Sequence, residues 1–268
     1  MGKDHPWPPF YFERDGDAFV PSKLTRNPWM ADAIAGGPVA ALIGAVIDEA
    51  GFDPAFEISR TTLDIFGKVP ALPLVPRVTA LRTGKQMQLH RIELLAEGKP
   101  VAQSHVLLAR HLETPTLLPP FAYPLPATVE DRQFLTGASM AGAIRTKPIE
   151  GEVRKPGRGI TWLAMDGEII RGTAPSPFVK ACLFSDFGNG IGSATRHDEW
   201  SFANLDISVY FLRMPRGEWL LIDAETVMAG NGHGLAQSTF ADCDGIYAFG
   251  RQTIFVGPSQ RKSDSSPA

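Results

Sequence analysis

The segment from Pro38 to Ala50, PVAALIGAVIDEA, is the feature that most constrains how this chain can fold. Its residues are apolar on every helical face until the last three, and a helix that is hydrophobic all round must be enclosed by other structure. Pro38 suits the first turn of a helix, and Gly51 suits its end. We therefore expect a buried helix over residues 38–50.

The segments after this helix have the composition of β-strands. Short turns with the sequences TGK and EGK lie between them and suit antiparallel hairpins. The predicted unit is therefore a buried helix followed by an antiparallel sheet. The strands are expected over Glu57–Phe66, Leu74–Arg82, Gln86–Glu97 and Val101–Arg110.

The second half of the chain repeats this arrangement. Residues 177–190, PFVKACLFSDFGNG, form a mostly apolar segment that begins with proline and ends with glycine. Aligning the glycines that end the two helices shifts the sequence by 139 residues, and the two LDI tripeptides give a shift of 142. Such drift is expected from insertions in the turns of a duplicated fold. Further strands are expected over Ser201–Leu212, Trp219–Ala229, Gly234–Ala241 and Ile246–Val256.

This repeat divides the chain into two units, residues 1–112 and 159–257. Residues 113–158 between them hold a proline cluster and a stretch rich in glycine and lysine, which predict a linker lying over the surface. Residues 258–268 are polar and are expected to be a disordered tail. The 268 residues are 44% hydrophobic and 21% charged, which excludes a wholly disordered or fibrous chain.

Charge and cysteine content exclude several classes of partner. A net charge of -3 gives no general attraction to nucleic acid or to anionic membrane. The two cysteines lie in neither CxxC nor CxxH spacing, which argues against a disulfide scaffold and a thiolate zinc site. The first nine residues lack the apolar core of a signal peptide, and no later run reaches the length of a membrane span. We expect a cytoplasmic protein with no nucleic-acid or membrane partner.

Two helix-and-sheet units in one chain resemble the double hotdog fold, an α+β fold, of the acyl-CoA thioesterase II family. The likeness covers roughly residues 10–112 and 160–256. In the first half, residues 36–39, GGPV, look like the GG-x-V stretch that opens the family's helix, and residues 63–70 look like its next strand.

In the second half, four short motifs resemble the same family in order. Ser185-Asp186 looks like its helix Ser-Asp, and residues 203–206, ANLD, look like its strand motif Ala-Thr-Ile-Asp. Residues 218–221, EWLL, match its Glu-Trp-Leu-Leu, and residues 248–252 match its last strand, Ala-x-x-x-Gln.

The resemblance implies a mechanism. In the family, a helix aspartate, a strand threonine and a last-strand glutamine position a water that attacks the thioester carbonyl without a covalent intermediate. These roles fall to Asp186, Asn204 and Gln252, and the second departs from the pattern because an amide replaces the hydroxyl. The implied substrate is a fatty or related acyl-CoA, and no metal or redox cofactor is implied. The oligomeric state is left open, a homo-oligomer included.

The residues around Asp186 support its assignment independently. It follows Cys182 by four residues and Val179 by seven, so it shares a helix face with apolar neighbours. A carboxylate in such a place is costly unless it has partners. The alternative is an aspartate that faces solvent near a helix end. The helix shift places Ile47 at the corresponding position of the first half, so we expect one active site per chain.

The two strand residues carry alternatives of their own. Asn204 and Asp206 alternate with Leu205 and Ile207, so we expect the polar pair on one strand face and the apolar pair on the other. Asn204 could instead belong to an ordinary half-solvated strand. Gln252 could equally be a surface residue of a terminal strand.

Gly36 and Gly37 admit two interpretations. They can allow the close backbone approach by which N–H groups at a helix N-terminus polarise a substrate carbonyl, or they can simply form the entry turn of the helix. Arginines at positions 213, 216 and 251 could meet the phosphates of coenzyme A, although solvated surface arginines are commoner.

Two other functions stay open. A hotdog hydratase or dehydratase acting on acyl-CoA would need a histidine with a carboxylate to move protons at carbon, and His105 is the candidate on a core strand. A non-catalytic protein that binds an acyl group or acyl-CoA would keep the fold and lose the site, which the amide at position 204 makes credible.

Overall fold

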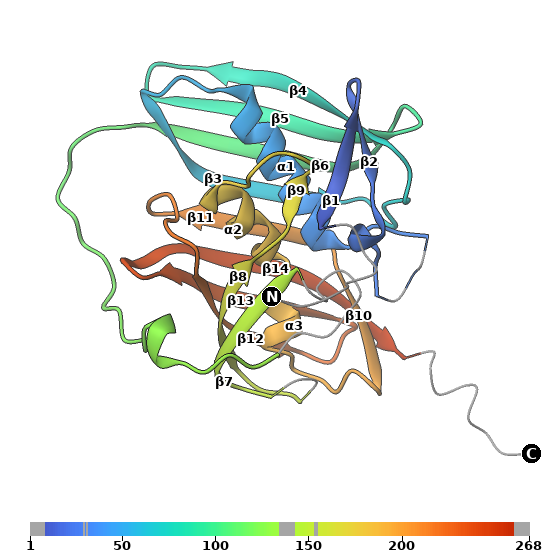
Figure 1. Ribbon diagram of the computed structural model, residues 1–268, viewed down its shortest axis with the longest axis vertical. Helices are drawn as coiled ribbons and strands as arrows, with labels where there is room; N and C mark the ends of the chain where they lie inside the picture. The colour runs from blue at the N-terminus through green and yellow to red at the C-terminus, as the bar shows by residue number, and fades with distance from the viewer. Residues whose placement is uncertain (1–8, 29, 31, 134–142, 153–154, 260–268) are drawn as a thin grey trace, which may run out of the picture.

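The computed structural model describes residues 9–28, 30, 32–133, 143–152 and 155–259 (Figure 1). The helices in these residues are η1 (Lys23–Thr25), α1 (Gly36–Ala50), η2 (Pro126–Thr128), α2 (Pro177–Ser185) and α3 (Gly188–Ile191). The strands are β1 (Phe10–Asp15), β2 (Ala18–Pro21), β3 (Phe56–Ile65), β4 (Leu74–Thr83), β5 (Met87–Ala96), β6 (Lys99–Arg110), β7 (Ile144–Glu150), β8 (Gly159–Met165), β9 (Glu168–Ile170), β10 (Trp200–Asn204), β11 (Asp206–Phe211), β12 (Leu220–Met228), β13 (His233–Asp242) and β14 (Gly245–Pro258).

Helix α1 confirms the buried helix predicted over residues 38–50. Residues 37–47 are buried, and the last three residues of the helix are exposed. Gly51 ends the helix in the left-handed conformation, with φ of 58°, which glycine adopts without steric cost. The helix crosses the inner face of the sheet formed by β3 to β6 (Figure 1).

The second predicted helix is present but divided. Ser176 caps the start of α2 by accepting a hydrogen bond from the Val179 N–H at 3.2 Å. The helix ends at Ser185, and α3 begins at Gly188 after two further residues. The break between α2 and α3 therefore falls on Asp186 and Phe187.

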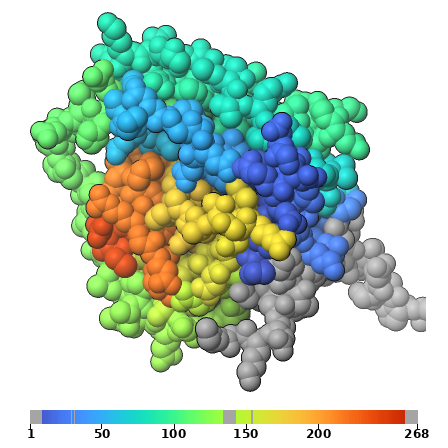
Figure 2. Space-filling view, turned by 45° about the horizontal axis from the view of Figure 1, so that its top comes forward, coloured from blue at the N-terminus to red at the C-terminus, as the bar shows by residue number. Residues whose placement is uncertain are grey.

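All strands join one largely antiparallel sheet. Its order is β7-β8-β12-β13-β14-β11-β3-β6-β5-β4-β2-β1-β9, with β10 paired to β14. The halves meet where β3 and β11 run antiparallel, with Leu63 opposite Ile207. They meet again where β9 pairs in parallel with β1, and Figure 2 shows the blue N-terminal segment beside the yellow segment around β9.

The two main helices pack against each other inside this sheet. A Cβ atom on Gly44 of α1 would lie only 2.9 Å from the Cys182 Sγ of α2. The missing side chain therefore lets the helix backbones come close, and α1 and α2 share one core with the inner faces of both halves of the sheet.

The structure departs from the prediction in the linker and in four further strands. Residues 144–150, which we assigned to the linker, form strand β7, paired with β8. Strands β1, β2, β8 and β9 were not predicted, because they are short or lie outside the repeated motif. The predicted tail lies largely in residues 260–268, outside the described residues.

Residues 121–124 of the linker are held against the outer side of the sheet by hydrogen bonds and apolar contacts. The Tyr123 hydroxyl donates to Asp223 at 2.6 Å, and the Trp162 indole N–H donates to the Pro124 carbonyl at 2.9 Å. A second apolar cluster, which includes Trp162, forms there, and Phe121 and Tyr123 pack against it. None of the described helices is long and apolar enough to cross a membrane.

Candidate active site

Asp186 occupies the break between α2 and α3, and three separate segments meet at its carboxylate. The Asn204 amide, at the end of β10, donates from Nδ2 to Asp186 Oδ1 at 2.6 Å and to the Asp186 backbone carbonyl at 3.1 Å. The backbone N–H of Gly37 in α1 donates to the same carboxylate. The structure thus brings together a residue of the second helix, a strand residue and the start of the first helix.

The start of α1 is shaped to receive this carboxylate. A Cβ atom on Gly36 would lie 2.3 Å from Asp186 Oδ1, so a side chain at this position would displace the aspartate. The residue that precedes the helix, Ala35, makes no side-chain capping bond. Asp186 therefore takes the place of a capping residue, and the positive end of the helix dipole favours its negative charge.

Opposing effects act on the pKa of Asp186. The residue keeps some solvent exposure, but its carboxyl group is enclosed, and burial raises its pKa above the ordinary aspartate value. The hydrogen bonds from Asn204 and Gly37 favour the charged form and partly oppose this rise. A carboxylate with a raised pKa is a stronger base than one in water, which suits general-base chemistry.

Gln252 lies on the same inner face of the sheet. Asn204 pairs with Ile254 of β14, two residues beyond Gln252, so Asn204 and Gln252 are diagonal neighbours. Gln252 is 2% exposed, and the interpretation of it as a surface residue is wrong. A Cβ atom on Gly188 would lie 2.2 Å from Gln252 Oε1, so glycine leaves the room that the amide fills.

Three buried polar atoms at this site have no hydrogen-bond partner among the described residues. They are Asn204 Oδ1, Gln252 Oε1 and Gln252 Nε2. Buried polar atoms in proteins are nearly always hydrogen-bonded to protein or to ordered water. Unpaired amide atoms beside an enclosed carboxylate are therefore suited to holding a water or a polar group of a ligand.

A strand irregularity turns Asn204 inward. Leu205, between β10 and β11, is 45% exposed, whereas Ile207 is 3% exposed, so the predicted shared face for these two residues is wrong. Asp206 does not point to the site with Asn204. Its carboxylate accepts the Thr253 backbone N–H at 2.7 Å and the Ser208 hydroxyl at 3.1 Å, which fixes the irregularity against β14.

Sequence shifts of 139, 142 and 147 residues place Ile47, Thr62 and His105 of the first half at the positions of Asp186, Asn204 and Gln252, and these residues form no comparable site. Ile47 is buried in α1. Thr62 and His105 lie opposite each other on β3 and β6, and each alternates with inward-facing residues such as Leu63 and Val106. Both therefore face the outer side of the sheet, away from Asp186. The pairing of His105 with a catalytic carboxylate, which a hydratase would need, is not formed with Asp186.

The arginines considered for coenzyme A phosphates have different surroundings. Arg213 makes a two-bond ion pair with the buried Asp242, at 2.6 and 2.7 Å, so it holds a turn of the fold. Arg251 faces the outer side of the sheet and donates to the Gly250 carbonyl at 2.7 Å. The side chain of Arg216 is exposed near Asp244.

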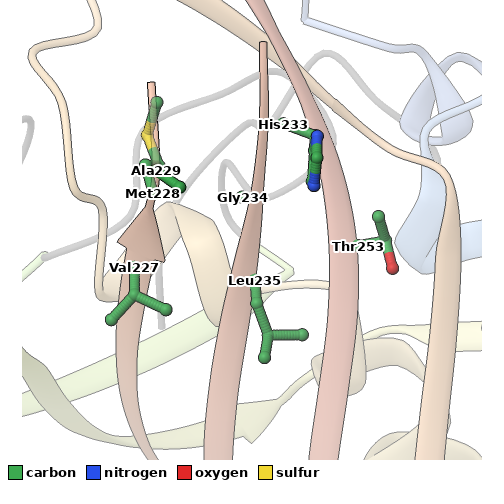
Figure 3. A pocket seen from close by; sticks show the side chains of 7 residues that line it. All are labelled: Val227, Met228, Ala229, His233, Gly234, Leu235 and Thr253. Carbon is green, nitrogen blue, oxygen red and sulfur yellow. The ribbon is translucent and has the colours of Figure 1, made fainter. Parts of the chain in front are cut away.

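An open hollow of about 540 Å³ lies on β12, β13 and β14 and is lined by Val227, Met228, Ala229, His233, Gly234, Leu235 and Thr253 (Figure 3). Thr253 alternates with Gln252 along β14, so the hollow is on the side of the sheet opposite to Asp186. Among the described residues, no group of three or more His, Cys, Asp or Glu is placed to hold a metal ion.

Similarity to solved structures defines the class of fold. A protein of unknown function with a hotdog fold from Alicyclobacillus acidocaldarius matches with a TM-score of 0.71 and 16% identity over 96% of both chains. The tesB protein of Mycobacterium avium subs paratuberculosis matches at 0.66 and 18%, over 92% of this chain and 96% of that one. Acyl-CoA thioesterase II TesB2 from Mycobacterium marinum matches at 0.67 and 16%, over 92% and 94%. The fold is a double hotdog, as predicted.

Family models identify the family within this class. Residues 25–109 match the acyl-CoA thioesterase N-terminal domain, and residues 120–256 match the acyl-CoA thioesterase C-terminal domain. The chain belongs to the acyl-CoA thioesterase family. A search of the curated proteins found no match.

Proposed function

We propose that this protein is an acyl-CoA thioesterase that hydrolyses a fatty or related acyl-CoA with a water held between Asp186, Asn204 and Gln252. The observation that carries the proposal is the Asp186 carboxylate, enclosed and raised in pKa, beside three unpaired amide atoms. Membership of the thioesterase family supports the reaction class.

The geometry suits activation of a water by two acceptors. Asn204 already uses Nδ2 to hold Asp186, so Oδ1 is the atom left to accept a proton of the water. Asp186 accepts the other proton and removes it as the water oxygen attacks the thioester carbonyl. Gln252 Nε2 is a donor for the water or for the oxygen that becomes negative during attack. Collapse of the tetrahedral intermediate breaks the carbon–sulfur bond, and the proton on Asp186 passes to the sulfur of the leaving coenzyme A.

In this mechanism, Gly36 and Gly37 act on the position of the Asp186 carboxylate. The Gly37 N–H holds the carboxylate, and Gly36 leaves the space for it. A thioester carbonyl polarised by the start of α1 would therefore lie directly beside the base. The first half would contribute the helix end and the second half the reacting groups.

A panel of acyl-CoA substrates followed with a thiol reagent tests the proposal. Release of free coenzyme A thiol, with a carboxylic acid as the other product, is expected. A change in enoyl absorbance without free thiol would indicate a hydratase or dehydratase. Saturable acyl-CoA binding without turnover would indicate a binding protein.

The binding protein is the second candidate because of one specific contact. The side chain of Asn204 is longer than the threonine found at this position in the family's strand motif. Its Nδ2 donates a hydrogen bond to Asp186 at 2.6 Å. If the amide fills the space that the water needs, the fold could bind a thioester without cleaving it.

A further inference from the structure

Ser238 lies beside the buried amide of Gln252. Ser238 of β13 is opposite Gly250 of β14, and Gln252 is opposite Ala236, so the serine and the glutamine are diagonal neighbours. Ser238 is 3% exposed and faces the core. The residues opposite them are Gly250 and Ala236, and the ring of Phe240 occupies the room beside Gly250.

The position of Gly188 shows how close the two groups are. A Cβ atom built on Gly188 would lie 2.2 Å from Gln252 Oε1 and 2.8 Å from Ser238 Oγ. The sum of these distances, 5.0 Å, is the upper limit of the separation between the two oxygens. A hydroxyl donates a proton and turns about its own bond, whereas an amide oxygen only accepts.

The chemistry of the site requires one orientation of this amide. With Oε1 on the side of Ser238, the Nε2 donor is on the opposite side of the amide. Asp186 and Asn204 Oδ1 already accept the two protons of the water. In the reverse orientation, Gln252 Oε1 would be a third acceptor with no proton left to accept. A donor on the Ser238 side therefore selects the orientation that activates the water.

We propose that Ser238 is a positioning residue. Its Oγ is not hydrogen-bonded to Gln252 in the structure, but it lies near enough to donate to Gln252 Oε1 when the site holds a water or a substrate, and so to direct Nε2 toward the reacting water or carbonyl. This inference rests on the proposed thioesterase function. It assigns to β13 a part in a site otherwise built from the helix break, β10, β14 and α1.

Ser238→Thr and Ser238→Val form the matched pair that tests it, because their side chains have the same shape and differ in one hydroxyl. The valine variant should lose about tenfold in kcat relative to the threonine variant, as expected for one neutral hydrogen bond, with little change in KM. Thr226→Val is the control. Thr226 is also buried on this face, but its hydroxyl bonds Asn189 at 3.1 Å, and its loss should lower thermal stability without changing kcat.

Two further measurements separate positioning from a structural role. In a Gln252→Ala background, the threonine and valine variants at position 238 should have equal kcat. The side-chain amide signals of Gln252 in an ¹⁵N NMR spectrum, assigned by their loss in Gln252→Ala, should exchange with solvent faster in the valine variant than in the threonine variant.

Equal kcat and equal amide exchange in the matched pair would overturn the role of Ser238. A difference in kcat that persists without Gln252 would overturn it as well. A parent protein with no hydrolysis would overturn the proposed function instead, and the amide exchange alone would then decide whether Ser238 holds Gln252.

Discussion

The two halves share one plan, but their central helices differ. Helix α1 runs without interruption through 15 residues, and its buried part is apolar. Helix α2 has nine residues and stops directly before Asp186. At this break the second half places a carboxylate in the core, whereas the corresponding position of the first half is the buried Ile47. One half thus supplies a regular helix with a positive N-terminal end, and the other half supplies the carboxylate that this end stabilises.

The sheets of the two halves differ in the same way. Strand β3 keeps its alternation around Thr62, which therefore faces outward. The corresponding region of the second half is divided at Leu205, and Asn204 turns inward. Two of the candidate site residues, Asp186 and Asn204, therefore lie where the second half departs from the regular unit, whereas Gln252 is turned to the core by the regular alternation of β14.

Asp186→Asn is expected to have the largest effect on activity. Loss of a general base costs roughly 10² to 10⁴ in rate, and the shape of the side chain is kept. The measurement is kcat/KM on the best acyl-CoA of the panel. Asp48→Asn is the control, since Asp48 is also a carboxylate of raised pKa, but it lies at the exposed end of α1 and accepts a hydrogen bond from Ser176. A parental rate in Asp186→Asn would make this aspartate structural.

Gly36→Ala tests whether the first half takes part in the site. The new methyl group would lie 2.3 Å from Asp186 Oδ1 and must displace it. Misplacing a catalytic group by about 1 Å can cost about 10² in rate, and we expect a loss of that order in kcat. Gly190→Ala is the control, because nothing lies within 4 Å of a Cβ there. Full activity in Gly36→Ala would show that Asp186 does not depend on the start of α1.

The fold was predictable because its main signal is strong and repeated. The apolar helix over 38–50 and the strand patterns after both helices predicted the elements that build the core. Strand β7 was missed because Pro148 and the flanking glycines resemble a linker. Its partner β8 provides the pairing that overrides this local composition.

The site was less predictable, because it depends on contacts between distant segments. The sequence motifs pointed to Asp186, Asn204 and Gln252, and the structure brings Asn204 to Asp186 and turns Gln252 to the same face. The contact of Gly37 with Asp186 joins residues 149 positions apart, and local patterns do not reveal it. Asp206 was placed on the wrong face because strict alternation cannot foresee an irregular strand.

The raised pKa of Asp186 predicts a stability difference that depends on pH. An acid whose pKa is higher in the folded state binds more protons when folded, so its burial lowers the free energy of unfolding as pH rises from the unfolded to the folded pKa. Asp186→Asn removes this penalty and should unfold at a higher temperature than the parent at pH 7. The advantage should shrink as the pH falls from the folded pKa of Asp186 toward the ordinary aspartate pKa, and it should be absent below that value. Thermal unfolding measured from below the ordinary aspartate pKa up to neutral pH tests this, and a constant difference would contradict burial as the cause.

Asn204→Thr should have the smallest effect on activity and decides how the second half works. A threonine hydroxyl can still donate to Asp186 or accept from the water, although it cannot do as much at once as the amide with its separate donor and acceptor. Because Asp186 and Gln252 are both present, we expect an active parent and a change in kcat of less than about tenfold, the range of one neutral hydrogen bond. Asn204→Leu, of similar size, is the control that removes both hydrogen bonds and should cost more. If the parent is inactive and Asn204→Thr gains hydrolysis, the Asn204 amide blocks the position of the water. The site at the break between α2 and α3 would then bind a thioester without hydrolysing it.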